Sequence, residues 1–246
     1  MPHQQFFYVN PQEVTKESLV IKGDEFKHLG VVVRKKPGDR AVAVDGQGNV
    51  FEFTITRIEK NFAEGRIDKK SRRVGEPLFR LTLGLALLKG QRFDWVIEKG
   101  TEIGIARFIP LLTDRGVAEQ SPSKINRWRR IALTAMKQSC RSIWPEVTEA
   151  QPISQVLNQS SEYALKLMAH PEAGTPKLSQ ILEEENHKHL RNGIIVIGPE
   201  GGFTADEVTT AMECGFSLFS LGPRRLRSET AAMVAATLVL EKLGEL

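Results

Sequence analysis

Residues 194–208 read IIVIGPEGGFTADEV, and this stretch decides the fold class of the chain. Its first four residues have the apolar, β-branched pattern of a buried strand. Three glycines and a proline follow in residues 198–202. Thr204 and Glu207 then have the spacing of a capping box, in which two side chains satisfy backbone N–H groups at a helix start. The stretch predicts a strand, a tight glycine turn and a helix, and glycine lets bare backbone approach a ligand closely.

The glycine turn matches neither of two common nucleotide-binding patterns. A P-loop has the pattern GxxxxGK[ST], and no lysine follows these glycines. A dinucleotide fingerprint has the pattern GxGxxG in the first βαβ unit, whereas this turn lies near the end of the chain. On these residues alone, a ligand site and a strand-to-helix turn without a ligand both stay open.

Strand-like and helix-like segments alternate from Phe79 onward, which is typical of a largely parallel α/β sheet. Ligands in such sheets bind beyond the carboxyl ends of the strands. Three predicted strand ends fall in the last part of the chain: LMAHPEAG (167–174), IGPEGG (197–202) and LGPRRLRSETA (221–231). We expect these three ends to build one pocket from backbone groups.

The first 73 residues have a different pattern. Residues 40–59 alternate apolar and polar side chains, with Phe51, Phe53 and Ile55 on one face, and the Asp45-Gly46 pair predicts a hairpin turn. Residues 23–34 predict one short helix with Asp24 near its N-cap. The charged stretch 69–77 ends in Gly-Glu-Pro. We therefore expect a small β-rich domain, a barrel, over residues 1–73, and an α/β domain over residues 74–246.

The charge balance favours a polyanionic partner. The chain has a net charge of +4 and a pI of about 9.1. Residues 1–73 hold 14 Lys and Arg against 10 Asp and Glu, so the whole excess lies in the first domain. No apolar run reaches the ~18 residues of a membrane helix, and the start lacks a signal pattern. With two cysteines far apart in sequence, we expect a cytoplasmic protein without a membrane partner.

A second basic surface is predicted on the helix that spans residues 124–141, which holds six basic residues and no acid. Arg127, Arg130, Lys137 and Arg141 follow three- and four-residue spacing and share one face. Such a stripe can neutralise the phosphates of a nucleic acid. The alternative is an ordinary solvated helix face.

The late stretch LRSETAA (226–232) places Ser228, Glu229 and Thr230 at a helix start, where capping is the simpler interpretation. A hydrolase would need a base beside Ser228, and no motif nominates one of the five histidines for that role. No HExxH pattern or Cys/His ligand set is present, so we expect no catalytic metal.

Two segments, IGPEGGFTADEV and LGPRRLRSETAAMVAA, together resemble the SPOUT class of S-adenosylmethionine-dependent methyltransferases. Within that class the chain is similar to the bacterial ribosomal RNA small subunit methyltransferase E family, which methylates N3 of a uridine in 16S rRNA. Three further segments carry the same resemblance: HLGVVVRKKPGD (28–39), KGQRFDWVIEKGTEIGIARFIPLLTDR (89–115) and RWRRIALTAMKQSCR (127–141).

The resemblance implies a PUA-like β-barrel over residues 1–73 and a SPOUT-type α/β domain with a deep trefoil knot over residues 74–246. It also implies a homodimer, with the cofactor pocket beside the subunit interface. The partner would be 16S rRNA or the small ribosomal subunit. Two alternatives stay open: a non-catalytic RNA-binding ribosome assembly protein, and a methyltransferase of another RNA position.

The expected site follows from these motifs. S-adenosylmethionine would be held by the three late loops, at Met168, Ala169, His170, Ile197, Gly198, Pro199, Glu200, Gly201, Gly202, Leu221, Gly222, Leu226, Arg227, Ser228 and Thr230. Arg227 is the expected catalytic residue, because its charge could stabilise the uridine anion. Glu200 is a second candidate, as a base. RNA phosphates would be bound by Arg34, Lys36, Arg40, Arg92, Arg115, Arg127, Arg130, Lys137 and Arg141.

Overall fold

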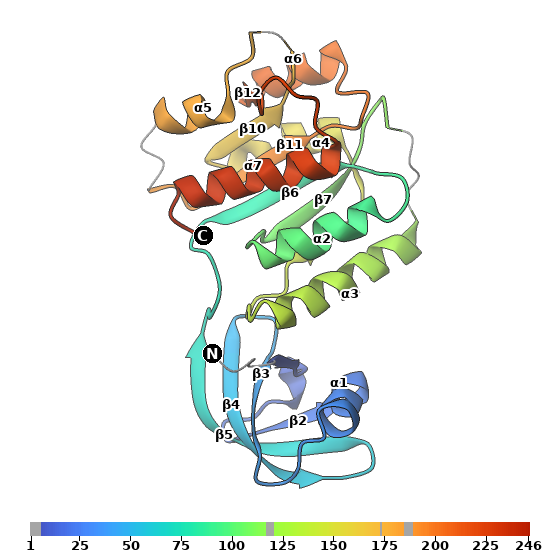
Figure 1. The fold of residues 1–246 in the computed structure, drawn as a ribbon, viewed down its shortest axis with the longest axis vertical. Coiled ribbons are helices and arrows are strands. Elements are labelled where there is room, and N and C mark those ends of the chain that lie inside the picture. Colours follow the sequence, from blue (N-terminus) through green and yellow to red (C-terminus); the bar gives the residue numbers. More distant parts are fainter. Residues whose placement is uncertain (1–5, 117–120, 173, 185–188) are drawn as a thin grey trace. The chain divides into compact units, whose positions relative to one another are not determined.

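The computed structural model describes residues 6–116, 121–172, 174–184 and 189–246. The chain divides into two compact units (Figure 1). The first holds Met1–Glu76 together with Leu133–Trp144, and the second holds Pro77–Ala132 together with Pro145–Leu246. The division gives the first unit a segment from the middle of the chain, which the sequence pattern did not indicate. The predicted boundary after residue 73 stays a prediction.

The first unit is built on a five-stranded sheet with the order β1-β3-β4-β5-β2. β1 pairs with β3 in parallel, and the other neighbours are antiparallel. The predicted hairpin at Asp45-Gly46 is confirmed, because the Asp45 carboxylate accepts the N–H groups of Gln47 and Asn49 and Gly46 has φ +73°. The strands are β1 (Phe6–Tyr8), β2 (Ser18–Lys22), β3 (Arg40–Val44), β4 (Asn49–Ile58) and β5 (Phe62–Arg72).

The alternation in β4 sorts its side chains onto two faces, as the sequence predicts. Phe51, Phe53 and Ile55 are buried in one apolar cluster with side chains of β2. Val50 faces the opposite side, where it packs in a second cluster with Met136. Both faces of this sheet are therefore covered, the second by the end of helix α3 (Pro122–Gln138) and the residues after it.

The predicted helix over residues 23–34 is divided. It starts as α1 (Gly23–Lys27) and continues as a π-helical turn, η2 (His28–Val32). Asp24 lies near the N-cap, as predicted: Lys22 is the N-cap without a side-chain bond, and Asp24 is in the first turn, where it pairs with Lys27. A short 3₁₀ turn, η1 (Pro11–Glu13), precedes β2.

The second unit is a parallel sheet with the order β12-β10-β11-β6-β7-β8, and β9 also pairs with β7. Every strand pair in it is parallel, so the predicted α/β class is confirmed. Its strands are β6 (Arg80–Ala86), β7 (Arg107–Leu112), β8 (Glu146–Val147), β9 (Gln151–Pro152), β10 (Leu165–Ala169), β11 (Asn192–Ile197) and β12 (Ser217–Phe219).

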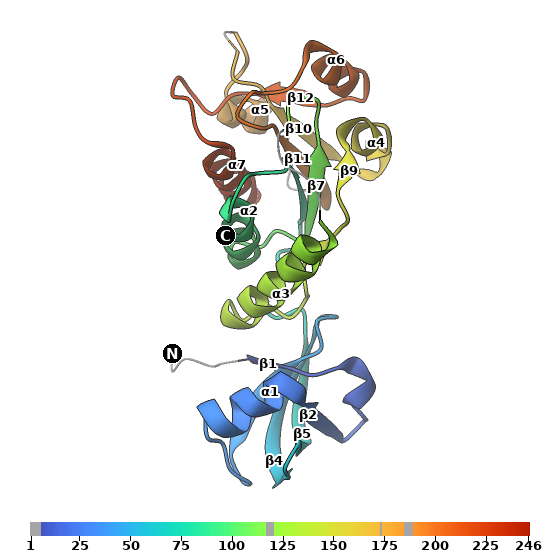
Figure 2. The same cartoon turned by 90° about the vertical axis from the view of Figure 1, so that its right-hand side faces the viewer.

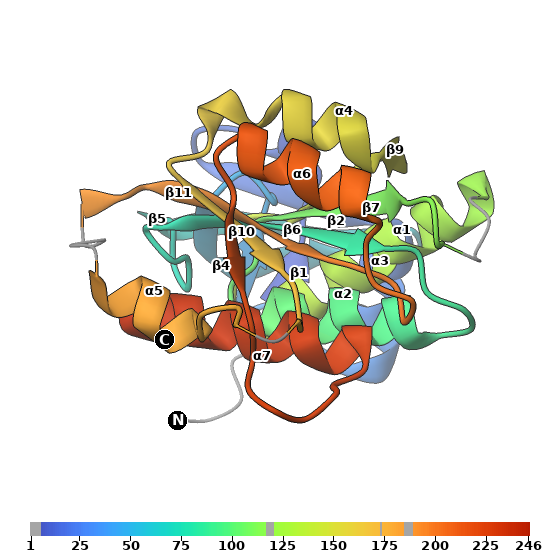
Figure 3. The same cartoon turned by 90° about the horizontal axis from the view of Figure 1, so that it is seen from above.

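Helices cover both faces of this sheet. α4 and α6 lie on one face, and α2, α5 and α7 lie on the other (Figures 2 and 3). The first face is sealed by an apolar cluster that includes Val196, Phe203 and Phe216. Within the described ranges, each helix is too short or too polar to cross a membrane. The bounds are α2 (Arg92–Glu102), α4 (Ile153–Asn158), η3 (Ser160–Glu162), α5 (Leu178–Glu184), α6 (Ala205–Glu213) and α7 (Ser228–Lys242).

Helix α7 takes the chain from the edge of the sheet back to its centre. It follows β12, the edge strand, yet packs against α2, β6 and β11. Its small and apolar side chains Ala232, Ala235 and Val239 are fully buried there. This return brings Ser228, the first residue of α7, next to Gly198, which follows β11 and lies thirty residues earlier in the sequence.

Candidate functional site

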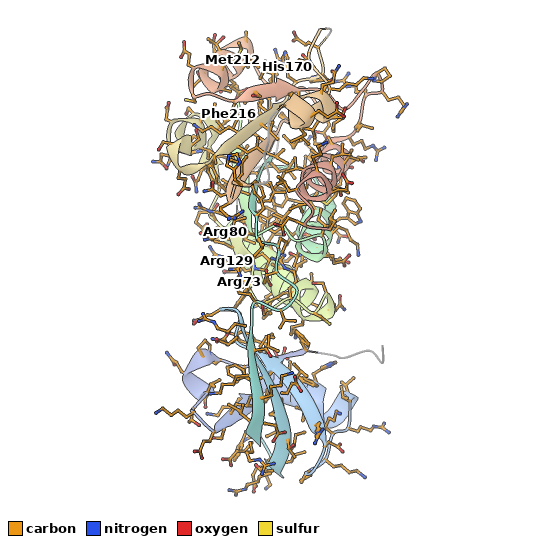
Figure 4. All side chains as sticks on the ribbon, turned by 90° about the vertical axis from the view of Figure 1, so that its left-hand side faces the viewer. Arg73, Arg80, Arg129, His170, Met212 and Phe216 are labelled. Carbon is orange, nitrogen blue, oxygen red and sulfur yellow. The ribbon has the colours of Figure 1, made fainter. Side chains whose placement is uncertain are left out.

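The three predicted strand ends come together at one edge of the sheet. β10 lies between β12 and β11, and its register aligns Met168 with Val196 and Ala169 with Phe219. Because all three strands are parallel, the loops that follow them leave from the same edge. His170, labelled in Figure 4, follows β10, and its N–H donates to the Phe219 carbonyl at 2.8 Å. The three strand ends therefore lie side by side, and one pocket built from their backbone groups stays a prediction.

The glycine turn has the predicted strand–turn–helix form. It is closed by a hydrogen bond of 2.9 Å from the Gly202 N–H to the Pro199 carbonyl, and Gly202 has φ +71°. The capping box is present: Thr204 accepts the N–H of Glu207, whose carboxylate accepts the N–H of Thr204. The buried Glu207 carboxylate also accepts the Asp114 N–H at 3.0 Å, which joins the loop after β7 to this turn.

The carbonyl oxygens of the turn are held by side chains from elsewhere in the chain. Ser228 donates its hydroxyl to the Gly198 carbonyl at 2.7 Å. Arg225 donates to the Glu200 carbonyl at 2.7 Å. Arg115 donates from one nitrogen to the carbonyls of Gly201 and Phe203, at 2.9 and 3.1 Å. In contrast, the Gly201 N–H meets no acceptor among the described residues.

Several of the glycines border open space. A Cβ atom built on Gly202 or Gly222 would meet no atom within 4 Å, and both have positive φ, +71° and +103°. A Cβ on Gly201 would touch only Arg115, at 3.5 and 3.6 Å. Gly198 differs, since a Cβ there would press on the Phe203 ring at 3.1 Å. Gly198 is therefore small because of packing, while the other three leave backbone exposed toward the site.

Charged side chains surround the turn. Arg92, at the start of α2, is ion-paired with Glu200 and lies 3.8 Å from a carboxylate oxygen of Glu229. The backbone N–H of Glu200, and then Arg92, hold the pKa of the Glu200 carboxyl below its ordinary value against the opposing effect of burial. A carboxylate with a lowered pKa is a weak base. This environment disfavours Glu200 as the catalytic base.

Arg227 is placed for a different role from its neighbours. It occupies the N-cap position of α7 with extended backbone, and its side chain makes no cap bond. Capping by Ser228, Glu229 or Thr230 is thus wrong, since α7 already begins at Ser228 and that hydroxyl serves Gly198. Glu229 contacts Arg92 instead of Arg227. The exposed Arg227 guanidinium has no ion pair or hydrogen bond within the described part of the chain.

The other expected cofactor residues differ in what they can present. Met168 and Ile197 are buried in the sheet, so only their backbone can face a ligand. His170 is partly buried and lies 3.2 Å from the Glu172 carboxylate. Residues that remain accessible at the ends of the three strands are Ala169, Glu200, Gly201, Gly202, Leu221, Gly222, Leu226, Arg227 and Thr230.

Two residues expected to bind RNA phosphates lie at the glycine turn instead. Arg92 pairs with Glu200, and Arg115 holds two turn carbonyls. Their positive charge alone suggested phosphate binding, because the sequence does not indicate which segment each side chain contacts. Sequence reasoning also missed Arg225, although an arginine inside the quoted strand-end motif LGPRRLRSETA was a signal for it.

The predicted basic stripe on α3 is only partly correct. The helix ends at Gln138, so Arg141 lies beyond it and does not share its face. Arg141 is 2% exposed and forms an ion pair of 2.8 Å with Glu76, which excludes it as a phosphate contact. Lys137 is paired with Glu25, and Arg127 with Asp94 at 2.5 Å. The helix itself has no acid, but other elements supply carboxylates that neutralise it.

The basic residues of the first unit stay on its surface. Arg34, Lys36 and Arg40 are all exposed, and they lie on the segment that leads from η2 into β3. Arg34 has φ +58°, a backbone conformation that non-glycine residues seldom adopt. On α3, Arg130 is exposed as well. These four remain predicted phosphate contacts.

Comparison with known proteins agrees with this architecture. Residues 75–240 match a family model described as an RNA methyltransferase domain, and residues 21–68 match one described as an RNA methyltransferase PUA domain. The chain is 31% identical over 228 residues to ribosomal RNA small subunit methyltransferase E from Synechocystis, covering 92% of this chain and 74% of that protein. The same-named protein from Bacillus subtilis is 28% identical over 244 residues, covering 92% and 93%.

A solved structure has the same fold over nearly its whole length. It is a ribosomal RNA small subunit methyltransferase E from Neisseria gonorrhoeae, crystallised with S-adenosyl methionine. The two chains are 27% identical, with a TM-score of 0.86, and the match covers 97% of this chain and 98% of the other.

Proposed function

Because the chain belongs to the ribosomal RNA small subunit methyltransferase E family, we propose that it transfers the methyl group of S-adenosylmethionine to N3 of a uridine in 16S rRNA. The chain is an rRNA methyltransferase with a PUA-like domain and a SPOUT-type α/β domain. The observation that carries the proposal is the convergence of three strand ends around a glycine turn whose backbone is bare toward the site.

The residues at this edge fit S-adenosylmethionine. Its adenine presents hydrogen-bonding edges that backbone groups can meet. The Gly201 N–H lacks an acceptor among the described residues, and Gly202 and Gly222 leave empty the space that side chains would fill. The loops after β10, β11 and β12 would hold the cofactor, mainly through backbone. Met168 and Ile197 would contribute no side chain, because theirs are buried.

Methyl transfer from S-adenosylmethionine does not require a covalent nucleophile from the protein. When bound, S-adenosylmethionine supplies a methyl group on a positively charged sulfur that a ring nitrogen can attack directly. A bond forms from uridine N3 to that methyl carbon, the sulfur–methyl bond breaks, and N3 gives up its proton. The protein must align N3 and make the loss of that proton easier.

Arg227 is the residue we assign to this second task. Its guanidinium is exposed beside the turn and is not committed to Glu229. A cation there would stabilise the negative charge that develops on the uridine as the N3 proton leaves. Glu200 would act as a fixed anion and not as the base, since its pKa is lowered. Water would then accept the proton.

The wider assembly is part of the same proposal. The exposed Arg34, Lys36 and Arg40 of the first unit, and Arg130 on α3, would bind phosphates around the target base. The target base would leave its stack to reach the site. We also propose the residue boundaries 1–73 and 74–246, a deep trefoil knot at the end of the chain, a homodimer and a cytoplasmic location, as the family resemblance implies.

Two measurements test the proposal. Calorimetric titration with S-adenosylmethionine asks whether the cofactor binds. Incubation with small ribosomal subunits from a strain that lacks the enzyme, followed by mass mapping of 16S rRNA, asks where a methyl group appears. We expect binding and one methylated uridine at N3. Absence of cofactor binding would favour an RNA-binding assembly protein, and methylation at another nucleotide would contradict the assigned target.

A further inference from the structure

We propose that Arg115 and Arg225 are positioning residues that hold the glycine turn in its ligand-binding conformation. The two side chains come from separate parts of the chain, one from the loop after β7 and one from the loop before α7. Both end on main-chain carbonyls of the same turn. This inference rests on the proposed function, because the ligand that the turn receives is S-adenosylmethionine.

The geometry of the peptide bond connects these carbonyls to the site. In a trans peptide the C=O of one residue and the N–H of the next lie in one plane and point in opposite directions. The structure has no cis peptide bond among its described residues. Arg225 holds the Glu200 carbonyl at 2.7 Å. It therefore fixes the direction of the Gly201 N–H, which has no acceptor among the described residues.

Arg115 fixes the next peptide plane in the same way. It holds the Gly201 carbonyl at 2.9 Å and the Phe203 carbonyl at 3.1 Å. The Gly202 N–H then points to the Pro199 carbonyl, where it closes the turn at 2.9 Å. Arg115 and Arg225 thus hold consecutive peptide planes. Of the two N–H groups in these planes, that of Gly202 donates inside the turn and that of Gly201 does not.

A turn of this composition needs such support. Glycine adopts positive and negative φ about equally readily, so a plane between two glycines can flip at little cost. Gly201 and Gly202 have no side chain whose packing could fix the peptide plane between them. Hydrogen bonds from a charged guanidinium are roughly twice as strong as neutral ones. Two of them can supply the rigidity that the sequence of the turn lacks.

Arg224 provides a matched control for Arg225. It is the preceding residue of the same exposed loop, and its side chain has no hydrogen bond or ion pair within the described part of the chain. Replacing either arginine with alanine removes one positive charge at nearly the same place. A general electrostatic effect on the site, or on bound RNA, would therefore be similar for the two variants.

The experiment measures S-adenosylmethionine affinity by calorimetry and methyl transfer to small ribosomal subunits, for the parent protein and for R224A, R225A, R225K and R115A. We expect R225A and R115A to bind the cofactor about tenfold more weakly, because R225A loses one charge-assisted hydrogen bond that orders the turn and R115A loses two. R224A should stay within about twofold of the parent. The cofactor KM should rise while kcat at saturating cofactor changes little.

R225K keeps the positive charge and a hydrogen-bond donor but loses the planar guanidinium, so its cofactor affinity should lie between those of R225A and the parent protein. Thermal unfolding of every variant accompanies the titrations; if R225A or R115A is unfolded, R225K compared with an R224K variant decides the question. Equal affinities for R224A and R225A, or full affinity in R225A, would overturn the inference. A parent protein that binds no S-adenosylmethionine would refute the proposed function instead, which is a separate outcome.

Discussion

The hydroxyl of Ser228 donates a hydrogen bond of 2.7 Å to the carbonyl oxygen of Gly198, and so joins the first residue of α7 to the first residue of the glycine turn. Ser228 is buried, and Gly198 is packed under the Phe203 ring. No strand or helix contains both residues, so this bond ties the return of the chain through α7 to the end of β11. The bond also explains why the helix begins with a serine that does not cap it: the hydroxyl of Ser228 is bonded to Gly198.

Removing this hydroxyl should loosen the connection. Ser228→Ala leaves the partly buried Gly198 carbonyl without its donor, which should cost about 1–2 kcal/mol of unfolding free energy. Urea unfolding measures this directly. Ser179→Ala, at an exposed position of α5, is the control and should change stability by less than ~0.5 kcal/mol. Equal stabilities of the two variants would show that the bond contributes nothing.

The bare backbone at Gly201 makes a second prediction. A side chain there would touch only Arg115, at ordinary contact distances, so Gly201→Val should fold. Its branched carbons should fill the space that the cofactor needs, and S-adenosylmethionine affinity should fall by ~100-fold or more, the loss of a few kcal/mol of packing. Calorimetry and thermal unfolding on the same samples check both halves. A folded variant with parental affinity would exclude Gly201 from the cofactor site.

Variants of one arginine and one lysine on α3, Arg130 and Lys137, can distinguish a role in RNA binding from a role in stability. Arg130 is exposed to solvent. Lys137 is mostly buried and forms an ion pair with Glu25. Arg130→Ala should therefore weaken RNA binding and reduce the slope of log K against log salt by about 0.9, the value for one lost phosphate contact. Lys137→Ala should leave that slope unchanged and lower the stability of the fold. The reverse pattern would mean that the ion pair opens when RNA binds.

The pH response of the turn follows from the lowered pKa of Glu200. Its own backbone N–H and Arg92 favour the charged form, so the ion pair is fully present above the ordinary glutamate pKa of about 4.3. The stabilisation is lost only as the pH falls through the lower, folded pKa. Arg92→Ala should raise the pKa of Glu200, which carboxyl ¹³C NMR can follow, with Glu200→Gln to assign the signal.

The same reasoning predicts what activity should not do. Glu200 stays ionised from about pH 6 to about pH 9, so its titration should not shape the rate profile there. Glu200→Gln should therefore keep the parental profile even if its overall rate is lower. A profile that loses its acidic limb in this variant would identify Glu200 as the base after all.

The predictable parts of this molecule are those that local chemistry determines. The capping box at Thr204 and Glu207, the hairpin at Asp45 and the strand ends at 169, 197 and 219 all follow from short patterns with a direct physical reason. Parallel strands then bring their ends to one edge without further information. The location of the candidate site was therefore accessible before the structure.

The partners of charged residues were not accessible in this way. The α3 helix lacks acids, yet Asp94 and Glu25 from distant segments pair with its Arg127 and Lys137. Glu76 in the same way pairs with Arg141, just after the helix. Spacing within one helix says which side chains share a face, but not which element will cover that face. The same limit hid Arg115 and Arg225, whose roles depend on where the glycine turn lies in space.

Arg227 is where structural and catalytic roles can be separated most sharply. A structural arginine at this helix start would pair with Glu229, but Glu229 contacts Arg92 and the Arg227 side chain has no partner within the described residues. Arg227→Ala should therefore change stability by less than ~1 kcal/mol, as expected for an exposed side chain. Urea unfolding gives this value and serves as the control for everything that follows.

The catalytic effect should be large by comparison. An arginine that stabilises charge on the uridine acts most strongly in the transition state. Its loss should lower the single-turnover methylation rate by ~100-fold, by analogy with removal of one preorganised donor. Cofactor and RNA affinities should fall much less. Raising the pH should partly restore the rate, because more of the uridine then arrives without its N3 proton and needs less stabilisation. Arg227→Lys should retain an intermediate rate, since it keeps the charge but not the planar fork. If Arg227→Ala methylates at the parental rate with both substrates saturating, or if its deficit is the same at every pH, the assigned role in proton loss is refuted.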